Sequence, residues 1–533
     1  MSMITYEDSP LELQRQASQA MIDARKTAVE RNRLGQFATP NTLAVDIARY
    51  VQSIIGATKG GIRFADPSIG SGSFFSAALT VFGAKRMSSA VGVELDPAFA
   101  DVARSLWANA GLEVINGDFT RVVADGACPA APNVILANPP YVRHHHMTRE
   151  EKERLHALTL KMTGVNVSGL AGLYVHFLLI ATAWMEEGGV AAWLVPSEFM
   201  DVNYGAAIKG FLADRVTLLR AHRFDPDDVQ FGDALVSSVV LVFRKAQPPA
   251  DHAALFTFGG SLAEPHAGDL IPLQQLRHAR KWTAYPAHAK NDRHTISDGT
   301  GPMLGDFFRV QRGIATGCNK FFVLERSEAQ RLGLPEKYLR PILPSPRHLK
   351  STSIDADGDG YPMLDRQLCV IDCNLPEPMV KADHPALWKY LETAQALGVM
   401  DGYLIGKRSP WYRQERREPT PFLCTYMGRG SDSKQPFRFI WNRSKAIGTN
   451  LYLMLQPLNG LAEMLRRDPD RAKAVHELLG QVTGGELRGE GRVYGGGLNK
   501  IEPSELARIS AAPFVERWPE ITTTVQPQRI LFC

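Results

Sequence analysis

The strongest constraint on the fold is a regular alternation of short apolar runs with helix-like segments over residues 62–245. Such runs, bounded by Gly, Pro, Asp and Asn, are typical of buried strands, and the segments between them are typical of crossover helices. The pattern predicts an α/β domain whose doubly wound sheet is covered on both faces. The seven expected strands are IRFADPS, AVGVELD, LEVINGD, NVILANPP, GGVAAWLVPS, VTLLRAHRF and VSSVVLVFRK.

The last two strands are separated by DPDDVQFGDAL, which is too short for a crossover helix, so we expect them to pair antiparallel. Ahead of the sheet, LELQRQASQAMIDARKTAVERNRLGQ predicts a helix that ends at Gly35. After it, a Pro-containing stretch near residues 246–253 predicts a domain boundary. We therefore expect a helical segment (1–34), the α/β domain (35–248) and a mixed α+β domain (249–533).

Charge and hydropathy narrow the class of protein. No apolar run is long enough to span a bilayer, and MSMITYEDSP lacks the pattern of a signal peptide, so we expect a cytoplasmic protein without a membrane partner. The net charge is +4, and the segment 407–445 contains ten basic and three acidic residues. This local excess predicts a surface that binds phosphates.

The first candidate site follows the first strand, in FADPSIGSGSFF. Asp66 ends the strand, Ser68 lies in the loop, and Gly70 and Gly72 would let the backbone approach a ligand closely. A tight structural turn is the alternative for such a loop on its own. The ends of the next two strands add specificity, because Glu94 stands where doubly wound sheets present an acid to ribose hydroxyls.

The third strand ends with Asp118, an acceptor for an adenine amino group, and Phe119, a flat surface for the ring. The G-x-G-x-x-G spacing of dinucleotide sites is absent, since GSGSFF has phenylalanines at the end of the motif. The whole set resembles the S-adenosylmethionine site of class I methyltransferases. S-adenosyl-L-methionine is therefore the expected cofactor.

The fourth strand ends in Asn-Pro-Pro-Tyr, residues 138–141. An exocyclic amine conjugated to a ring is a poor nucleophile, and two acceptors aimed at its hydrogens would draw electron density onto nitrogen. The side-chain carbonyl of Asn138 and the backbone carbonyl of Pro139 can be those acceptors, while Pro140 helps to fix the direction of the chain. Tyr141 supplies a face on which a planar base can stack. A simple turn is the alternative.

Three consecutive histidines, His144 to His146, follow this tetrapeptide. Neighbouring side chains point in different directions, and no carboxylate or cysteine stands at ligand spacing. We therefore predict no metal site and interpret the segment as a polar loop that faces phosphates, with Arg143 as a candidate contact to DNA.

These motifs together resemble the N6-adenine DNA methyltransferases of restriction-modification systems, in the gamma arrangement typified by TaqI. The resemblance begins at LGQFATP, continues through NPPY to VQFGDALVSSVVLVF, and extends more loosely to RVYGGGLNKIEPSEL. It implies that Thr39 contacts the methionine end of the cofactor. It also implies that Phe231 holds a flipped base from the side opposite Tyr141, and that base flipping from double-stranded DNA precedes methyl transfer.

On this resemblance, residues 35–248 are the catalytic domain and residues 249–533 a DNA target-recognition domain. In the latter, arginines and lysines alternate with Trp411, Tyr412, Tyr426 and Trp441, as expected for contacts to phosphates and base edges. A solvated charged face over an ordinary core is the alternative. The candidate DNA contacts there are Lys407, Arg408, Arg413, Arg416, Arg417 and Arg443.

Other functions remain open at this point. Cytosine N4 or RNA adenine methylation would use similar chemistry, although Ser usually replaces Asn138 in cytosine N4 enzymes of this type. A non-catalytic DNA-binding scaffold subunit is an alternative from a different class. The sequence argues against it, because every cofactor and catalytic position is filled. Any cognate restriction endonuclease is expected to be a separate chain, and a monomer is favoured.

Overall fold

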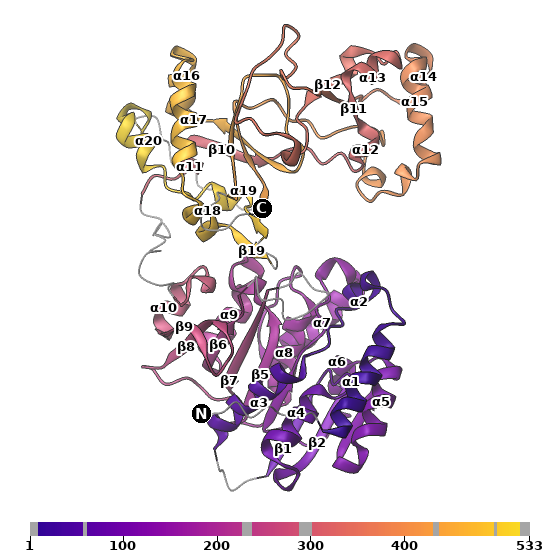
Figure 1. Ribbon diagram of the computed structural model, residues 1–533, viewed down its shortest axis with the longest axis vertical. Helices are drawn as coiled ribbons and strands as arrows, with labels where there is room; N and C mark the ends of the chain where they lie inside the picture. The colour runs from indigo at the N-terminus through magenta and orange to yellow at the C-terminus, as the bar shows by residue number, and fades with distance from the viewer. Residues whose placement is uncertain are drawn as a thin grey trace. The chain divides into compact units, whose positions relative to one another are not determined.

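The fold is described from a computed structural model that describes residues 9–56, 61–225, 237–286, 301–429, 436–494 and 498–522. The chain forms two compact units: the first comprises Met1–Arg293 with Tyr494–Gly496, and the second comprises His294–Val493 with Gly497–Cys533. Figure 1 shows both units.

The first unit is built on a nine-stranded sheet with the order β3-β2-β1-β4-β5-β7-β6-β8-β9. All seven predicted strands are present. Strands β1 to β5 run parallel where they pair, and β7 is antiparallel to both β5 and β6, which confirms the antiparallel pairing expected for the last two. The strands are β1 (Ile62–Asp66), β2 (Met87–Glu94), β3 (Leu112–Asn116), β4 (Val134–Ala137), β5 (Val190–Pro196), β6 (Thr217–Arg223), β7 (Ser238–Arg244), β8 (Ala253–Gly260) and β9 (Pro265–Pro272).

Helices cover both faces of this sheet (Figure 1). Residues of β4 alternate between two apolar clusters, because successive side chains of a strand point to opposite faces. One cluster contains side chains of α3, α4 and α5, and the other contains side chains of α6, α8 and α9. The helices of the unit are α1 (Pro10–Asp23), α2 (Ala28–Leu34), α3 (Asn41–Ile55), α4 (Ser73–Phe82), α5 (Pro97–Trp107), α6 (Phe119–Ala124), α7 (Arg149–Thr163), α8 (Leu173–Trp184), α9 (Ala206–Asp214) and α10 (Leu273–His278).

The N-terminal segment forms two helices, so the prediction of a single helix that ends at Gly35 is wrong. Thr27 and Glu30 form a reciprocal cap, in which the Glu30 N–H donates to Thr27 Oγ1 and the Thr27 N–H donates to Glu30 Oε2. Such a capping box satisfies free N–H groups at the start of a helix, so a new helix begins at Ala28.

The domain boundary also differs from the one expected at residues 248 and 249. Strand β8 pairs parallel with β6, and β9 pairs antiparallel with β8, so the sheet continues to Pro272. The Pro-containing stretch is thus a turn between β7 and β8. Exposed and partly buried positions alternate in β9, as expected of a strand that ends a sheet.

The second unit is mixed α+β. A five-stranded sheet has the order β10-β18-β15-β17-β13, and two three-stranded sheets have the orders β11-β14-β12 and β16-β20-β19. Two apolar clusters form its interior. Its strands are β10 (Phe308–Arg312), β11 (Val323–Glu325), β12 (Leu339–Ile342), β13 (Ser353–Ile354), β14 (Leu368–Ile371), β15 (Phe422–Thr425), β16 (Met427–Arg429), β17 (Phe439–Asn442), β18 (Tyr452–Pro457), β19 (Arg492–Tyr494) and β20 (Leu498–Lys500).

Short helices connect these strands and pack beside them. They are α11 (Leu304–Phe307), α12 (Asn319–Phe322), α13 (Arg326–Arg331), α14 (Glu377–Asp383), α15 (Pro385–Ala396), α16 (Asn459–Arg467), α17 (Arg471–Gln481), α18 (Gly484–Glu490), α19 (Pro503–Leu506) and α20 (Ala512–Arg517). In the part of the chain that the structure describes, no helix has both the length and the apolar character needed to cross a membrane.

Candidate active site

A pocket lies in the first unit at the carboxyl ends of β1, β2 and β4. This is the edge at which open α/β sheets bind their ligands. The predicted site residues that line it are Thr39, Asp66, Ser68, Gly70, Glu94, Asn138 and Pro140. The predicted residues Gly72, Asp118, Phe119, Pro139 and Tyr141 lie outside this lining.

The loop after β1 is held by its glycines and by Glu94. Gly70 and Gly72 have φ angles of 55° and 95°, in the left-handed region that favours glycine. The Gly70 N–H donates to Glu94 Oε2 over 2.9 Å. A Cβ on Gly72 would lie 2.3 Å from Trp107 Nε1, so this glycine allows the loop to pack on α5. Gly70 lines the pocket, whereas Gly72 has a packing role.

Two buried carboxyl groups give the pocket an acidic character. Asp66 is 2% exposed and Glu94 is 9% exposed. Burial, with a smaller contribution from the nearby Glu94 carboxylate, raises the pKa of Asp66 to about 8, although the hydrogen bond from the Ser68 N–H opposes this rise. Burial also raises the pKa of Glu94, although the N–H groups of Asp96 and Gly70 oppose this rise. Because buried negative charge is costly, these two carboxyl groups favour a ligand with positive charge and hydroxyl donors.

Asn138 has one end of its amide bonded and the other end without a partner. Its Nδ2 donates to the carbonyl of Phe37 over 2.9 Å and to Thr39 Oγ1 over 3.1 Å. Its Oδ1 is buried and accepts no hydrogen bond from any residue that the structure describes. The two bonds assign the amide orientation, since a flipped amide would place its oxygen against the Phe37 carbonyl. The unpaired acceptor therefore remains available to a ligand.

Tyr141 is held rigidly beside this amide. Its ring is 7% exposed, its hydroxyl donates to the Leu194 carbonyl over 3.1 Å, and its N–H donates to the Gly35 carbonyl over 3.1 Å. A Cβ on Gly35 would lie 2.3 Å from the Tyr141 nitrogen, so glycine is required in the LGQF stretch. Burial raises the pKa of Tyr141 far above its usual range, and the phenol stays neutral. The predicted partner Phe231 lies outside the described residues.

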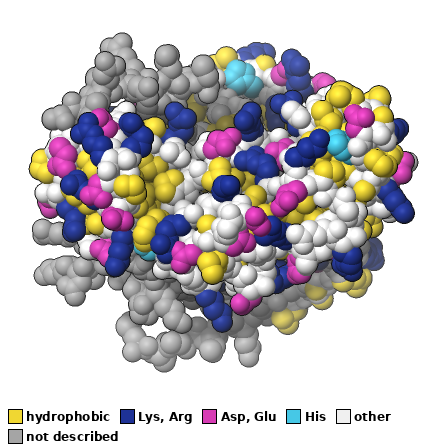
Figure 2. Space-filling model, turned by 90° about the horizontal axis from the view of Figure 1, so that it is seen from above, with side chains coloured by type: hydrophobic (Ala, Val, Ile, Leu, Met, Phe, Trp, Pro, Cys, Tyr) yellow, Lys and Arg dark blue, Asp and Glu magenta, His cyan; other side chains and the backbone are white. Residues whose placement is uncertain are grey.

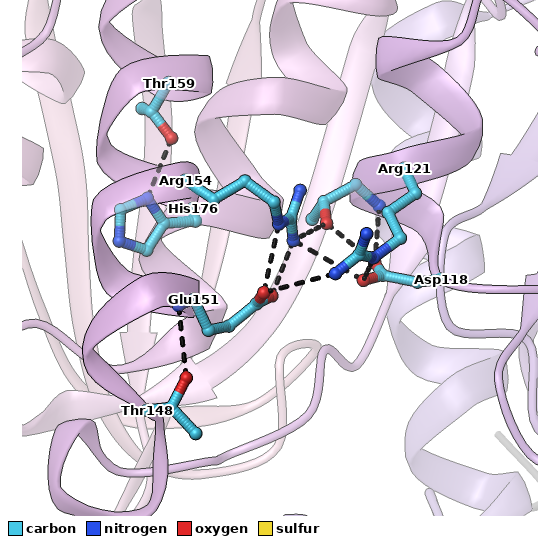
Figure 3. A network of polar contacts seen from close by, with 8 residues as sticks. Asp118, Arg121, Thr148, Glu151, Arg154, Thr159 and His176 are labelled. Atoms are coloured by element: carbon cyan, nitrogen blue, oxygen red, sulfur yellow. Dashed lines mark hydrogen bonds and ion pairs between the residues drawn. The ribbon is translucent and has the colours of Figure 1, made fainter.

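Asp118 was predicted to end the third strand, but β3 ends at Asn116 and Asp118 caps α6, where its carboxylate is already engaged (Figure 3). Oδ1 accepts from the Thr120 N–H over 2.9 Å and thereby caps α6. Oδ2 lies 3.4 Å from Arg121 Nε and 3.5 Å from Arg154 Nη2, and both arginines also pair with Glu151 of α7. The carboxylate is thus part of an ion-pair network that joins α6 to α7.

Phe119 is 1% exposed and packs in the core. Its ring centroid lies 5.3 Å from that of Phe177 and 6.0 Å from that of Trp184. Phe177, from α8, lines the pocket, so Phe119 supports the pocket from behind another ring. Sequence reasoning missed Phe177 because it lies within a helix that is apolar all round.

Helix α1 contributes a wall of the pocket, although the sequence predicted a separate segment there. Arg15, Gln19 and Asp23 line the pocket. These polar residues recur every fourth position and therefore lie on one face of the helix. That spacing was the signal in the sequence that could have identified them.

Several of the arginines predicted to contact DNA in the second unit also have partners within the protein. Arg408 donates to the carbonyls of Ala315 and Thr316, and burial lowers its pKa. Arg443 pairs with Asp355 and lies over the Trp441 ring. These two side chains hold loops and strands together, so excess charge in the sequence does not by itself identify contacts.

Arg417 is similarly engaged, since its Nε donates to the Arg312 carbonyl over 3.3 Å. Lys407, Arg413 and Arg416 are exposed, and the Arg416 side chain is 89% exposed. On the face drawn in Figure 2, Lys and Arg side chains are intermixed with Asp and Glu, so no block of positive charge covers the described part of that face.

In the first unit Arg143 is also exposed, and it precedes a short 3-10 helix formed by the three histidines. The His145 and His146 rings lie 4.1 Å apart. Burial is the main cause that lowers the pKa of His144 and of His145, and nearby positive groups lower both further. Within the described ranges, no group of three or more His, Cys, Asp or Glu side chains is placed to hold a metal ion.

The strand order and the pocket at the carboxyl edge define the fold as that of class I S-adenosylmethionine-dependent methyltransferases. A solved structure with a similar fold is the type IIL restriction-modification enzyme MmeI in complex with DNA, with a TM-score of 0.54 and 13% sequence identity. That match covers 84% of this chain and 66% of the MmeI chain.

Family models agree with the fold and are more specific. Residues 133–230 match the Eco57I restriction-modification methylase model, and residues 279–529 match the C-terminal domain of type II methyltransferase M.Eco57I. Over these residues the chain is similar to type II restriction-modification methyltransferases of the Eco57I kind.

Curated relatives are of the same kind. The type II methyltransferase M.XamI of Xanthomonas campestris pv. amaranthicola is 29% identical over 490 residues, which are 90% of this chain and 85% of the relative. The type II methyltransferase M.AccI of Acinetobacter calcoaceticus is 24% identical over 386 residues, which are 70% of this chain and 67% of the relative. The likeness thus extends across both units.

Proposed function

We propose that this protein transfers a methyl group from S-adenosyl-L-methionine to the N6 amine of an adenine flipped out of double-stranded DNA. It acts at a specific DNA site, as the modification enzyme of a restriction-modification system. The observation that carries this proposal is the buried Oδ1 of Asn138, which has no partner among the residues described. A buried acceptor without a donor is costly, and a substrate amine would satisfy it.

The chemistry requires acceptors rather than a base. When the amine donates its two hydrogens to Asn138 Oδ1 and to the Pro139 carbonyl, its lone pair is freed from the ring and directed away from both acceptors. When bound, the cofactor would supply the methyl group from a sulfonium centre, and its carbon–sulfur bond would break to leave the neutral thioether S-adenosylhomocysteine. The resulting cationic nitrogen is acidic and loses its proton to solvent, so alignment of the two reactants provides most of the rate acceleration.

The pocket fits this cofactor by charge and by position. Glu94 ends β2, where an acid meets ribose hydroxyls, and its Oε2 already accepts from the N–H of Gly70. Asp66 offers a buried carboxyl for the ammonium group of the methionyl end, and Thr39 borders the same pocket. A cationic ligand would lower the pKa of Asp66 and so stabilise the charged pair.

Stacking offsets the cost of flipping the base. Extrusion of a base costs a few kcal/mol, and aromatic stacking contributes about 1–3 kcal/mol per base. Tyr141 is suited to this role because its hydroxyl and its N–H are both fixed by backbone carbonyls. Phe231 is proposed as the opposing ring on the resemblance in sequence alone.

DNA recognition is assigned to the second unit. Its exposed cations Lys407, Arg413 and Arg416 are suited to phosphate contacts, and Arg143 is a further candidate in the first unit. The relatives M.XamI and M.AccI are named as type II methyltransferases, which supports DNA as the substrate. A cognate nuclease, if one exists, is proposed to be a separate chain, and the enzyme to act as a monomer.

The decisive experiment is nucleoside mass spectrometry of unmethylated plasmid DNA after incubation with the protein and S-adenosylmethionine. We expect N6-methyladenine, and we expect none with Asn138→Ala. Formation of N4-methylcytosine would overturn the assignment of adenine as the target base but would agree with the proposed chemistry at the amine. Binding of the cofactor without methylation of any DNA base would overturn the proposal and favour a scaffold subunit or another substrate.

A further inference from the structure

The polar face of α1 meets the loop after β1 through a continuous chain of hydrogen bonds. Arg15 Nη1 donates to Ser71 Oγ over 2.9 Å, and Ser71 Oγ donates to Gln19 Oε1 over 2.8 Å. Gln19 Nε2 then donates to Asp23 Oδ2 over 2.9 Å. Ser71 lies directly after Gly70, and all four of these α1 and loop residues line the pocket. Helix α1 is therefore joined to the loop that follows Asp66, the residue to which the proposed function assigns the ammonium group of the methionyl end.

Arg15 is buried and only partly bonded. It is 3% exposed, and Glu12, which pairs with it, is 2% exposed. Nε and Nη2 donate to the two carboxylate oxygens of Glu12 over 2.9 and 2.7 Å. A guanidinium has five N–H groups, so the bonds to Glu12 and Ser71 leave one N–H on each Nη without a partner among the described residues. Glu12 thus fixes the orientation of a guanidinium that keeps two N–H donors without a partner among the described residues.

The carboxylate of the cofactor needs a positively charged partner in the pocket. The methionyl end of S-adenosylmethionine carries an ammonium and a carboxylate, and Asp66 is suited to the ammonium. Arg15 is the only Lys or Arg among the described residues that line the pocket. Guanidinium groups with two parallel N–H donors bind carboxylates in a specific geometry.

We propose that Arg15 of the N-terminal helix binds the carboxylate of the methionyl end of the cofactor, and that α1 is therefore part of the cofactor site. This inference rests on the proposed function, since it takes S-adenosylmethionine as the ligand. Glu12 is a positioning residue, because it holds the guanidinium without reaching the ligand.

The test compares two ligands that differ in the carboxylate. Dissociation constants are measured by calorimetry for S-adenosylmethionine and for decarboxylated S-adenosylmethionine, with the full-length protein and with Arg15→Gln. We expect Arg15→Gln to weaken the binding of S-adenosylmethionine about 10- to 100-fold, as for removal of a charge-assisted hydrogen bond. Binding of the decarboxylated ligand should weaken less than about twofold. Arg25→Gln, at an exposed arginine of the same segment, should change neither constant.

A second variant guards against misfolding, because Arg15→Gln leaves Glu12 buried without its partner. The double variant Glu12→Gln, Arg15→Gln removes both charges. It should also bind S-adenosylmethionine more weakly while its affinity for the decarboxylated ligand changes little. Equal weakening of both ligands would mean that Arg15 only supports Ser71, and unchanged binding of both would leave it no role in the site, so either result overturns the inference. If the unaltered protein binds neither ligand, the assignment of the cofactor itself fails.

Discussion

Replacement of Asn138 by alanine separates a structural cost from a catalytic one. The change removes the bonds from Nδ2 to the Phe37 carbonyl (2.9 Å) and to Thr39 Oγ1 (3.1 Å). Each such bond contributes about 1 kcal/mol net, so the free energy of unfolding should fall by about 1–2 kcal/mol. Asn133, at the opposite end of β4, is the matched control, because its amide also makes two bonds, with the Arg63 N–H and the Gly61 carbonyl.

The effect on rate should be far larger than the effect on stability. The unpaired Oδ1 of Asn138 would accept from a nitrogen on which positive charge develops, so its contribution increases in the transition state. Removal of one such preorganised hydrogen bond elsewhere costs about 10²- to 10³-fold in kcat, and we expect a decrease of that size. Affinity for S-adenosylhomocysteine should stay within about twofold, because the amide contacts the substrate amine.

Single-turnover transfer of a labelled methyl group to plasmid DNA measures this rate directly, and thermal unfolding measures the structural cost. Asn133→Ala should lower the free energy of unfolding about as much as Asn138→Ala does, but it should leave the rate of methyl transfer unchanged. If Asn138→Ala methylates DNA within about tenfold of Asn133→Ala, the role of Oδ1 in activating the amine is refuted.

Three further predictions follow from the same structure. Because burial raises the pKa of Asp66 from 3.8 to about 8, the folded protein retains a proton that the unfolded chain releases, so its free energy of unfolding should fall as pH rises from about 4 to about 8. Asp66→Asn should flatten that fall in thermal melts, and an unchanged slope would contradict the assignment. Phe119→Ala should lower the free energy of unfolding in urea by about 3–5 kcal/mol, because its ring is fully buried; a loss of cofactor affinity at unchanged stability would contradict this. Neutralising Arg413 and Arg416 should reduce the slope of log affinity for DNA against log salt by about 0.9 for each phosphate that the protein no longer neutralises, whereas Arg408→Gln should mainly lower stability; the reverse pattern would move the DNA surface elsewhere.

The sheet of the first unit was predictable because its signals are local. Each strand is a short apolar run, and each is ended by residues with turn chemistry. The same locality places Asp66, Glu94 and Asn138 at the carboxyl ends of β1, β2 and β4, where parallel strands bring them to one edge. Strands β8 and β9 were missed because they follow a Pro-containing stretch that resembles a linker, and the pairing of β8 with β6 is long-range.

The orientation of side chains around the pocket was not predictable in the same way. Sequence spacing puts Asp118 and Phe119 at a strand end, but packing against Arg154 and Phe177 decides that one is ion-paired and the other enclosed. Likewise, the basic segment predicts a charged surface, yet Arg408 is bonded to backbone carbonyls. Such choices depend on neighbours that are distant in the chain.

The sequence by itself determined the strands that meet at the edge with the pocket, the glycine loop, and an amide at the tip of β4, because backbone geometry and apolar periodicity act over a few residues. Only the tertiary structure decided that α1 closes the pocket with Arg15, and that Asn138 keeps one buried acceptor unpaired among the described residues. The physical reason is that burial and hydrogen-bond satisfaction are properties of atoms brought together from distant segments, here residues 12–39 with residues 66–138.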